Sequence, residues 1–565
     1  MDESTARPTD ASGSSPDAPP SPDDAAAVDD ALARVEPPLR RALHRLWRTL
    51  EGPPGPTSYR RTRSLILRLL GVVYVAAFAG AVLQVVPLIG HHGLLPADLY
   101  LDQVRAGLGA DAPWELPTLL WIDASDAALM TVSVVGLVLG LALLLGVEWA
   151  PLLLGLWVAQ LSLVHVGQRF WAFGWETQLL ETTLLAALLC PWDRLRPLDA
   201  RDPPRVAIVL LRWLAFRIMI GAGLIKLRGD PCWHDLTCLD YHFETQPNPN
   251  PLSWYLHNAP EWLRHGGVLF NHLAELVAPF FVFGPRRLRH LAGAILVGFQ
   301  ASLILSGNLS FLNWLTIVPC LACFDDRLLA RLLPRRLRAR IGEASPPSRR
   351  LTILAWSFAA LVAWRSVDVV VNLISPDQAM NRSFDRLHLV NTYGAFGRVT
   401  RERHELVIEG SPDASGDDAW RPYSLPCQPG DPRRRPCVIT PYHLRLDWLM
   451  WFAGIEAGDA GALRREDWVI HLLAELLAGE PSITALLAVD PFAGEGPPRR
   501  VRVVLYRYHF TAPATADEGW WTREPIGVLI RPLSADDPEL RAYLEPRGWL
   551  TRLGPGDAST RSEAP

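Results

Sequence analysis

Long apolar runs separated by short polar stretches fill the first two thirds of the chain. A helix needs about 20 apolar residues to cross the hydrocarbon core of a bilayer, and about nine segments reach or approach that length. These segments are Leu65 to Ile89, Ala128 to Val147, Pro151 to Val166, Trp175 to Trp192, Val206 to Leu227, Val268 to Phe283, Leu288 to Leu305, Leu309 to Phe324 and Leu351 to Ile374. Several are short or carry charges, but together they predict an α-helical polytopic membrane bundle over residues 60–376.

The pattern changes from about Asn391 to short alternating segments such as HELVIEG and RVRVVLYRYHF, separated by Pro, Gly and Asp. Alternation of apolar and polar residues is typical of antiparallel strands. The segments YHLRLDWLMWFAG and DWVIHLLAELLAG instead have helical spacing of apolar residues. Residues 377–540 are therefore predicted to form a β-rich α+β domain outside the membrane, followed by a tail at residues 541–565.

The N-terminal residues have a different character. Residues 1–30 are rich in Asp, Pro, Ser and Ala and contain almost no large apolar side chains, so burial cannot offset the entropy of ordering them. Residues 1–59 are therefore predicted to be a disordered cytoplasmic region with a basic end. The features of a cleavable signal peptide do not occur there, so we expect the first membrane helix to direct insertion.

Composition excludes some classes of function. Hydrophobic residues make up 49% of the chain and the mean hydropathy is +0.12, which argues against a purely soluble protein. The net charge is -4 and the basic residues lie in short clusters between apolar runs, so nucleic acid is not an expected partner. High Ala and Arg content with few Lys residues is typical of GC-rich bacterial genomes and predicts a bacterial-type protein.

Basic loops give the orientation, because short loops with excess Lys and Arg stay in the cytoplasm. The basic stretches begin at Arg60, Arg194, Arg286 and Arg327. With nine spans and a cytoplasmic N-terminus, all of them fall on the cytoplasmic side. The residues after Ser375 are then predicted to lie outside, beyond the inner membrane of a bacterium or in the lumen of the endoplasmic reticulum of a eukaryote.

Cysteine placement fits this orientation, since disulfides persist in oxidising compartments. Cys232 and Cys238 share one predicted outer loop, and Cys427 and Cys437 share the outer domain. Two local disulfides are predicted, with pairs of free thiols as the alternative. No further ligands at suitable spacing accompany these pairs, so no metal site is predicted. The other cysteines lie near predicted cytoplasmic helix ends: Cys190, Cys320 and Cys323.

Ionisable residues inside the predicted spans converge on the outer half of the bundle. Such residues are expensive in a bilayer and usually face a bundle interior or a water-filled cavity. They define a candidate polar cavity formed by Glu176, Glu181, Arg217, Lys226, His272 and Glu275. One interpretation is a set of satisfied pairs that fix helix packing, such as Glu181 with Arg217 and Arg365 with Asp368. The other is a cavity open to the outside that binds or transforms a substrate.

Common catalytic signatures do not occur in the sequence. The nucleophile elbow G-x-S-x-G, the zincin motif H-E-x-x-H, the P-loop and the dinucleotide fingerprint are all missing. The chain is therefore not predicted to be a lipase of the usual type. No cofactor is predicted, and a non-enzymatic role is favoured over an enzymatic one.

Four long strings resemble the lipase maturation factor family. They are GAGLIKLRGDPCWHDLTCLDYHFETQPNPNPLSWYLHNAP from Gly221, FGWETQLLETTLLAALLCPW from Phe173, VNTYGAFGRVTRERHELVIEG from Val390 and CQPGDPRRRPCVITPYHLRLDWLMWFAG from Cys427. The resemblance implies a polytopic protein of the endoplasmic reticulum membrane that assists the folding of secreted lipases, so its partners would be the lipid bilayer and exported client proteins. The family-motif residues in the first string are Asp230, Trp233, Asp235, Glu244, Gln246 and Asn250.

A shorter string supports a rival hypothesis. GLIKLRGDPCW is similar to a helix end in vitamin K-dependent carboxylases, in which a membrane-embedded Lys acts as base. This resemblance implies an enzyme that acts on a lipid or quinone-like substrate, with Lys226 as base and Glu176 or Glu181 as its partner. The leading hypothesis remains a non-catalytic, membrane-anchored folding factor whose outer domain and Cys232 to Pro260 loop engage exported clients.

Overall fold

The structure is a computed structural model that describes residues 49–51, 57–192, 201–332, 345–413, 419–457 and 466–550. Most of the predicted N-terminal region and the last part of the predicted C-terminal tail lie outside these residues. Residues up to Gly55 together with Pro285–Arg287 form one unit, and the rest of the chain forms a second unit. The site and all contacts described below belong to the second unit.

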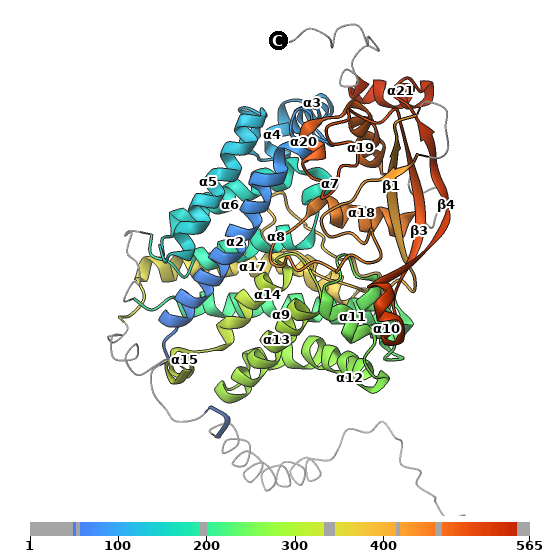
Figure 1. The fold of residues 1–565 in the computed structure, drawn as a ribbon. Helices are drawn as coiled ribbons and strands as arrows, with labels where there is room; N and C mark the ends of the chain where they lie inside the picture. The colour runs from blue at the N-terminus through green and yellow to red at the C-terminus, as the bar shows by residue number, and fades with distance from the viewer. Residues whose placement is uncertain are drawn as a thin grey trace, which may run out of the picture. The chain divides into compact units, whose positions relative to one another are not determined.

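The apolar segments of the sequence are all helical in the described part of the chain (Figure 1). The helices are α2 (Arg60–Ile89), α5 (Asp126–Leu144), α6 (Ala150–Val166), α8 (Gly174–Ala187), α9 (Arg205–Gly229), α12 (Glu261–His272) with its continuations η4 (Leu273–Val277) and η5 (Ala278–Phe283), α13 (Arg286–Ser306), α14 (Leu312–Cys320) with η6 (Leu321–Cys323), and α17 (Arg349–Ile374). Helix α12 continues as one turn of π-helix and then as a 3₁₀-helix that contains Pro279, which cannot donate an intrahelical hydrogen bond.

Six of the described helices are long and apolar enough to cross a membrane, judged by length and composition. They are α2, α5, α9, the continuous helix Glu261–Phe283, α13 and α17. Helix α6 has 17 residues and α8 has 14, and α14 with η6 is also a short apolar helix. At 1.5 Å per residue, a 14-residue helix is about 21 Å long, less than the hydrocarbon thickness of about 30 Å. The polytopic helical architecture is thus confirmed, whereas the prediction of nine spans is not.

Shorter helices connect these elements. Between α2 and α5 lie α3 (Ala97–Leu108), η1 (Gly109–Asp111), α4 (Ala112–Glu115) and η2 (Leu119–Trp121), and α7 (Gln168–Trp171) precedes α8. The connection from α9 to α12 contains η3 (Pro231–Trp233), α10 (Cys238–Thr245) and α11 (Pro251–His257), and α15 (Asp326–Leu332) follows η6.

The C-terminal region, residues 377–550, contains a small antiparallel sheet of strand order β2-β1-β3-β4. The strands are β1 (Arg403–Ser411), β2 (Arg421–Pro422), β3 (Arg500–Phe510) and β4 (Trp521–Leu533). The helices of this region are α18 (Arg445–Glu456), α19 (Asp467–Ala478), α20 (Pro481–Thr484), η8 (Pro513–Glu518), α21 (Pro538–Leu544) and η9 (Glu545–Arg547). The two segments with helical spacing form α18 and α19, and the two alternating segments form β1 and β3. The predicted α+β pattern is present, with a smaller sheet than the description β-rich implies.

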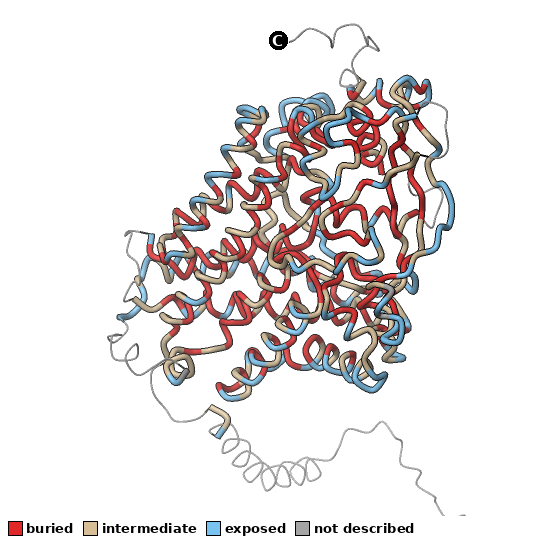
Figure 2. The backbone as a smooth tube through the Cα atoms, in the orientation of Figure 1, coloured by how far each residue is buried: buried red, intermediate tan, exposed pale blue. Residues whose placement is uncertain are grey.

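The strands of the sheet differ in how far they are buried. Glu405 of β1 lies opposite Tyr506 of β3, and Val504 of β3 lies opposite Val528 of β4, with register shifts between them. Strand β1 is almost wholly buried, whereas β4 is exposed over most of its length (Figure 2). The sheet therefore presents one exposed strand at its β4 side.

The loops of the bundle gather in two groups. The first group, which we call the basic end, consists of the predicted cytoplasmic loops. The Ser58 hydroxyl lies within hydrogen-bond distance of the carboxylates of Asp202 (2.9 Å) and Asp326 (2.7 Å). Arg63 Nε lies 2.9 Å from Glu148 Oε2, and both side chains are buried.

The second group, the sheet end, contacts the C-terminal region. A ring nitrogen of His471 lies 2.7 Å from the carbonyl oxygen of Leu94, and Asn308 donates to the carbonyl oxygen of Cys437 (2.9 Å). Along the chain, the apolar helices run alternately between the basic end and the sheet end, and this includes the short helices α6, α8 and α14.

Candidate functional site

A cavity of about 1110 Å³ lies between the bundle and the C-terminal region. Helices α9, α12, α13 and α14 supply its bundle side, and α18 supplies much of its other side. Aromatic and aliphatic side chains dominate the wall: Met219, Phe270, Phe299, Leu303, Trp448 and Phe452. Charged side chains also line the cavity, and some of them are paired: Arg169 with Glu466, and Arg264 with Asp240. A large cavity with a mainly apolar wall is the usual form of a small-molecule site.

Lys226 forms the polar centre of the cavity wall. It lies in the last turn of α9, and its Nζ donates to Asn271 Oδ1 (2.8 Å) and Glu275 Oε1 (2.6 Å). Asn271 Nδ2 donates to Glu275 Oε2 (3.1 Å), and the Lys226 ammonium lies 4.9 Å from the Trp233 ring centroid. Asn271 and Glu275 are one helical turn apart, with Glu275 in the π-helical turn η4. The three polar side chains, all buried, make a hydrogen-bonded cluster in which the charges of Lys226 and Glu275 balance.

His242 of α10 also lines the cavity and is buried. Burial, and in addition the positive charge of Lys226, lower the pKa of its imidazole to about 4. The ring is therefore neutral at pH 7. Within the described residues, no hydrogen bond is formed to its ring nitrogens, while the Phe396 ring lies edge-on at 4.8 Å.

Glu181 and Arg217 form a second buried cluster that does not line the cavity. Arg217 Nη2 contacts the Glu181 carboxylate, and Arg217 Nη1 donates to the carbonyl oxygen of Asn391 (2.9 Å). The Tyr393 hydroxyl donates to Glu181 Oε2 (2.7 Å). This cluster ties the VNTYG string, which begins at Val390, to α8 and α9.

Glu176 belongs to a third buried cluster. Arg445 of α18 places its Nη1 2.7 Å from Glu176 Oε1, and both side chains are essentially inaccessible to solvent. Gln160 donates to Glu176 Oε2 (2.6 Å), and Arg445 donates to the carbonyl oxygen of Phe170 (2.6 Å). The pair therefore joins the bundle to the C-terminal region.

The six residues of the predicted polar cavity thus separate into different places. Only Lys226 and Glu275 line the cavity. A ring nitrogen of His272 lies 2.9 Å from the carbonyl oxygen of Trp233, so this side chain holds the α9–α10 connection. The rival hypothesis paired Lys226 with Glu176 or Glu181, but the carboxylate beside Lys226 is that of Glu275.

A second predicted pairing also differs. Arg365 lies 3.3 Å from Asp385 and donates to the carbonyl oxygen of Phe384 (2.6 Å), instead of pairing with Asp368 one turn along α17. The loop after α17 folds back to bring Asp385 to Arg365, an approach that helical periodicity does not encode.

The first half of the family-motif loop lies beside the cavity, and Trp233 lines it. Asp230 accepts from the backbone N–H of Cys232 (3.0 Å) and from Arg401 (2.8 Å). Trp233 donates to the carbonyl oxygen of Phe396 (3.1 Å), while Asp235 is exposed. Asp230 and Trp233 therefore fix the loop against residues 396–401.

The second half of the loop joins α13 and the sheet. Glu244 accepts from the Phe510 N–H (3.0 Å) at the end of β3. Gln246 and Asn250 donate to the carbonyl oxygens of Ser306 (3.0 Å) and Leu305 (2.8 Å), at the end of α13. Asn250 also caps α11 through a reciprocal pair of hydrogen bonds with Ser253. These motif residues hold the loop in place, whereas the Asp235 side chain forms no such contact within the described ranges.

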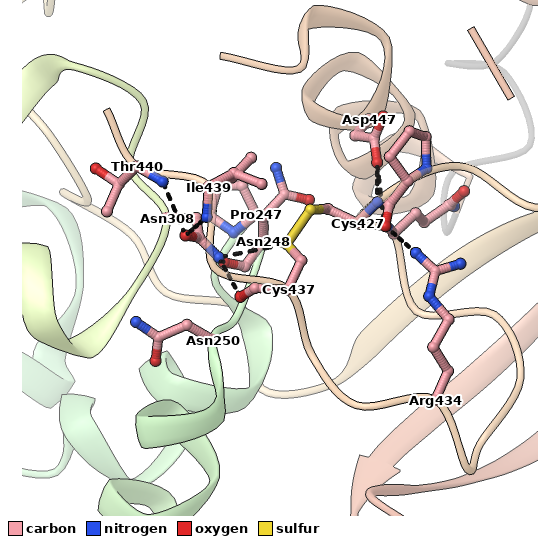
Figure 3. Close-up of a disulfide and its surroundings, with 12 residues drawn as sticks. Pro247, Asn248, Asn250, Asn308, Cys427, Arg434, Cys437, Ile439, Thr440 and Asp447 are labelled. Carbon is pink, nitrogen blue, oxygen red and sulfur yellow. Dashed lines mark hydrogen bonds between the residues drawn. A yellow bond between two sulfur atoms is a disulfide. The ribbon is translucent and has the colours of Figure 1, made fainter. Parts of the chain in front are cut away.

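Both predicted disulfides are present: Cys232 with Cys238 and Cys427 with Cys437. Figure 3 shows the second, which lies between Asn308 at the end of α13 and Asp447 of α18. Asp447 accepts from the Cys427 N–H (2.6 Å). Burial raises the pKa of Asp447 to about 6, although this N–H group acts in the opposite direction. The disulfide thus lies where the bundle meets the C-terminal region.

The Asp230 carboxylate lies within 4.8 Å of the sulfur atoms of Cys232 and Cys238. Sulfur atoms in a disulfide offer no thiolate to a metal ion, so these three residues do not form a metal site in this state.

Several site residues were missed by sequence reasoning. Asn271 could have been predicted most readily, because an Asn one turn before a Glu inside an apolar run indicates a polar cluster on one helix face. Arg445, Tyr393 and His242 lie outside the apolar segments, and the sequence gives no signal that they approach the bundle. Their roles follow from the packing of the C-terminal region against α8, α9 and α10.

The fold and its buried polar centres define a polytopic helical membrane protein with a C-terminal region built around a small antiparallel sheet. The profile described as lipase maturation factor transmembrane domain matches residues 61–331, and the profile described as lipase maturation factor C-terminal domain matches residues 389–531. The chain belongs to the lipase maturation factor family.

Individual relatives agree with this assignment. Lipase maturation factor 1 of Bos taurus is 46% identical over 536 residues, covering 89% of this chain and 94% of that protein. The human protein of the same name is 45% identical over 533 residues, covering 88% and 93%. Lipase maturation factor 2 of Gallus gallus is 29% identical over 615 residues, covering 87% and 84%. No solved structure matches the chain. These relatives are animal proteins, so they do not support the predicted bacterial type, and family membership favours a maturation factor over the rival enzyme.

Proposed function

We propose that this protein is a membrane-anchored maturation factor that assists the folding of exported lipases. The observation that carries the proposal is the extent of the family match, which includes both the bundle and the C-terminal region. Contacts between the two parts are buried and specific, as in the pair Arg445 and Glu176. In this proposal the bundle anchors the C-terminal region at the membrane surface in a fixed orientation.

In this proposal all nine apolar helices cross the membrane, with the N-terminus in the cytoplasm and the C-terminal region in the lumen of the endoplasmic reticulum. The alternation of the helices between the basic end and the sheet end supports it, because short basic loops stay in the cytoplasm. Crossing by the six long helices alone would place the C-terminal region on the same side as the N-terminus. Local thinning of the bilayer accommodates short helices at modest cost.

Contacts of two bundle loops with the C-terminal region give separate support to this number of crossings. Asn308 donates to the carbonyl oxygen of Cys437 (2.9 Å), and the Trp254 indole donates to Thr511 (3.1 Å). These contacts support a common side for the loops before α12 and α14 and the C-terminal region, and in this proposal α14 crosses the membrane. Both disulfides then lie in one oxidising compartment.

Strand β4 is the proposed contact for client chains. Within the described residues it pairs with β3 alone, so its other edge offers backbone N–H and C=O groups. Ile526 and Val528 are 47% and 54% exposed. An extended segment of an unfolded client adds to such an edge through main-chain hydrogen bonds, which suits a factor that must accept non-native chains.

Secretion of an active lipase tests the proposal. Cells that lack the endogenous maturation factor are complemented with wild type, Ile526→Lys, Val528→Lys or the control Val489→Lys, whose side chain is 52% exposed outside β4. We expect wild type and the control to restore lipase activity, and the β4 variants to restore markedly less at equal membrane abundance. Failure of wild type to raise secreted lipase activity would refute the proposed function. Full rescue by both β4 variants would refute the role of β4 alone.

A further inference from the structure

The chain has 55 Lys and Arg residues, and Lys226 is the only lysine among them. Every other basic position is an arginine, and the single ammonium group lies at a buried position in the cavity wall. Arg at surface positions does the same work as Lys, because both supply a solvated positive charge. The one place where lysine occurs is therefore the one place where ammonium geometry matters.

The geometry explains why arginine does not replace it. An ammonium has three donors in a compact tetrahedral group, whereas a guanidinium has five donors in a planar fork. Two Lys226 donors go to Asn271 and Glu275, which leaves one donor without a hydrogen-bond acceptor in the described residues. A guanidinium at this position would leave more donors unpaired against an apolar wall, which is costly.

Charge balance defines what this donor can bind. Glu275 compensates the charge of Lys226, and both of its oxygens already accept hydrogen bonds from Lys226 and Asn271. The pair of Lys226 and Glu275 therefore has no net positive charge with which to attract an anionic ligand. His242 is neutral at pH 7, and its ring nitrogens form no hydrogen bond within the described residues, so it adds an uncharged polar group to the wall. The centre therefore suits an uncharged oxygen acceptor, such as a hydroxyl or carbonyl group.

The remaining wall defines the rest of the ligand. Phe270, Phe299, Leu303 and Phe452 surround a volume of about 1110 Å³, somewhat above the range of about 300–1,000 Å³ that is typical of drug-sized ligands. Such a volume accommodates an extended or polycyclic hydrocarbon. Helices α9, α12 and α13 of the apolar bundle supply this wall, so a ligand that partitions into a bilayer matches its chemistry.

We propose that the cavity binds one uncharged amphiphile of the neutral lipid class, whose hydroxyl or carbonyl oxygen accepts a hydrogen bond from Lys226 and whose hydrocarbon part fills the apolar wall. A sterol and an acylglycerol share this chemistry. Binding is non-covalent, and the ligand braces α18 against α9, α12 and α13. The inference goes beyond the proposed function in the maturation of lipases and does not depend on it.

Photolabelling of the purified full-length protein tests the inference. The protein is isolated from membranes of cultured cells in mild detergent and incubated with one of three diazirine probes: a sterol, a diacylglycerol or a fatty acid, which is anionic. We expect one neutral probe to label peptides from the cavity wall at a saturable site, and the fatty acid to label at least about tenfold more weakly, the factor that 1.4 kcal/mol produces. The sterol and diacylglycerol arms distinguish the two sources of the neutral chemistry.

Variants separate the polar centre from the apolar wall. The double change Lys226→Met with Glu275→Leu removes both charges together, so no buried charge is left unpaired. Leu303→Trp fills the cavity, and Leu305→Trp on the same helix, where Leu305 is 62% exposed, is the matched control. We expect the double change and Leu303→Trp each to reduce labelling at least about tenfold, while Leu305→Trp labels like wild type. Size-exclusion profiles establish that each variant is folded.

Three results would overturn the inference. The first is labelling of folded Leu303→Trp at the wild-type level, which would place the probe outside the cavity. The second is equal labelling by the fatty acid and the neutral probes, which would remove the argument from charge balance. The third is saturable labelling by none of the probes. Lipase secretion is a separate readout, so failure here leaves the proposed function standing.

Discussion

The Arg445 guanidinium lies 2.7 Å from the Glu176 carboxylate, and neither side chain is accessible to solvent. Arg445 belongs to α18 of the C-terminal region and Glu176 to α8 of the bundle. The Trp171 ring centroid lies 3.9 Å from the guanidinium carbon, and the Arg445 backbone N–H donates to Gln84 of α2 (2.9 Å). A buried charge with this many partners fixes the two parts of the chain in a single arrangement.

Breaking this pair is expected to destabilise the protein strongly. Removal of one partner leaves the other charge buried and unpaired, which costs about 3–5 kcal/mol. We therefore expect Glu176→Gln and Arg445→Met each to lower the melting temperature of the detergent-solubilised protein, and the combination of both changes to cost less than the sum of the single changes.

The exposed pair Arg421 and Glu495 provides the control for that experiment. Their side chains are 40% and 59% exposed, so Glu495→Gln should change the free energy of unfolding by less than about 1 kcal/mol. Thermal unfolding of the five proteins checks the expectation. Equal effects of Glu176→Gln and Glu495→Gln would show that the buried pair does not hold the two parts together.

The disulfide between Cys427 and Cys437 is expected to stabilise the contact with α13. It closes a loop with a sequence separation of 10. The lower entropy of the cross-linked unfolded chain then stabilises the folded protein by about 3 kcal/mol. Cys427→Ser combined with Cys437→Ser should lower the melting temperature, and reductant should lower the melting temperature of this variant less than that of wild type. A melting temperature unchanged by the double substitution would contradict the expectation.

Acidification is expected to destabilise the protein partly through His242. Its pKa is lowered from 6.5 to about 4 in the folded state, so between these values the unfolded chain binds a proton that the native state does not. Stability contributed by the neutral ring is present above pH 6.5 and is lost as pH falls, by about 2 kcal/mol at pH 5. His242→Gln should therefore show a smaller decrease in melting temperature between pH 7 and pH 5 than wild type.

The exposed His234 is the matched control for the pH experiment. His234→Gln should keep the pH dependence of wild type. Identical pH dependence in wild type and His242→Gln would show that the ring does not titrate differently in the native and unfolded states.

Glycosylation is expected to report the side of the C-terminal region. Val438 is 68% exposed, and Val438→Asn creates the acceptor pattern N-x-T with Thr440. We expect this variant to gain an endoglycosidase-sensitive glycan in mammalian cells, because the nine crossings that we propose would place residue 438 in the lumen. Glu343→Asn, which creates N-x-S with Ser345 in the basic loop, should stay unmodified. An unmodified Val438→Asn with a modified Glu343→Asn would refute the proposed orientation.

Local sequence information predicted much of the architecture. The apolar segments were found because an apolar run must satisfy its own backbone hydrogen bonds as a helix. Strands β1 and β3 followed from alternation, and the pairing of Cys427 with Cys437 followed from their proximity in the chain and a shared compartment. Helix ends differ from the predicted ones. The segment predicted from Trp175 to Trp192 ends at Ala187 as α8, shortly before Pro191.

The sequence by itself determined the elements that depend on neighbouring residues: the apolar helices, strands β1 and β3, the two local disulfides and the family. The pair of Glu181 with Arg217 was among those expected from the sequence, but only the tertiary structure decided the others. Lys226 pairs with Glu275, 49 residues away, and Glu176 pairs with Arg445. The physical reason is that a buried ion pair forms wherever helix packing brings two side chains within a few ångströms, and the packing of α8, α9, α12 and α18 is a property of the whole fold that no local periodicity records.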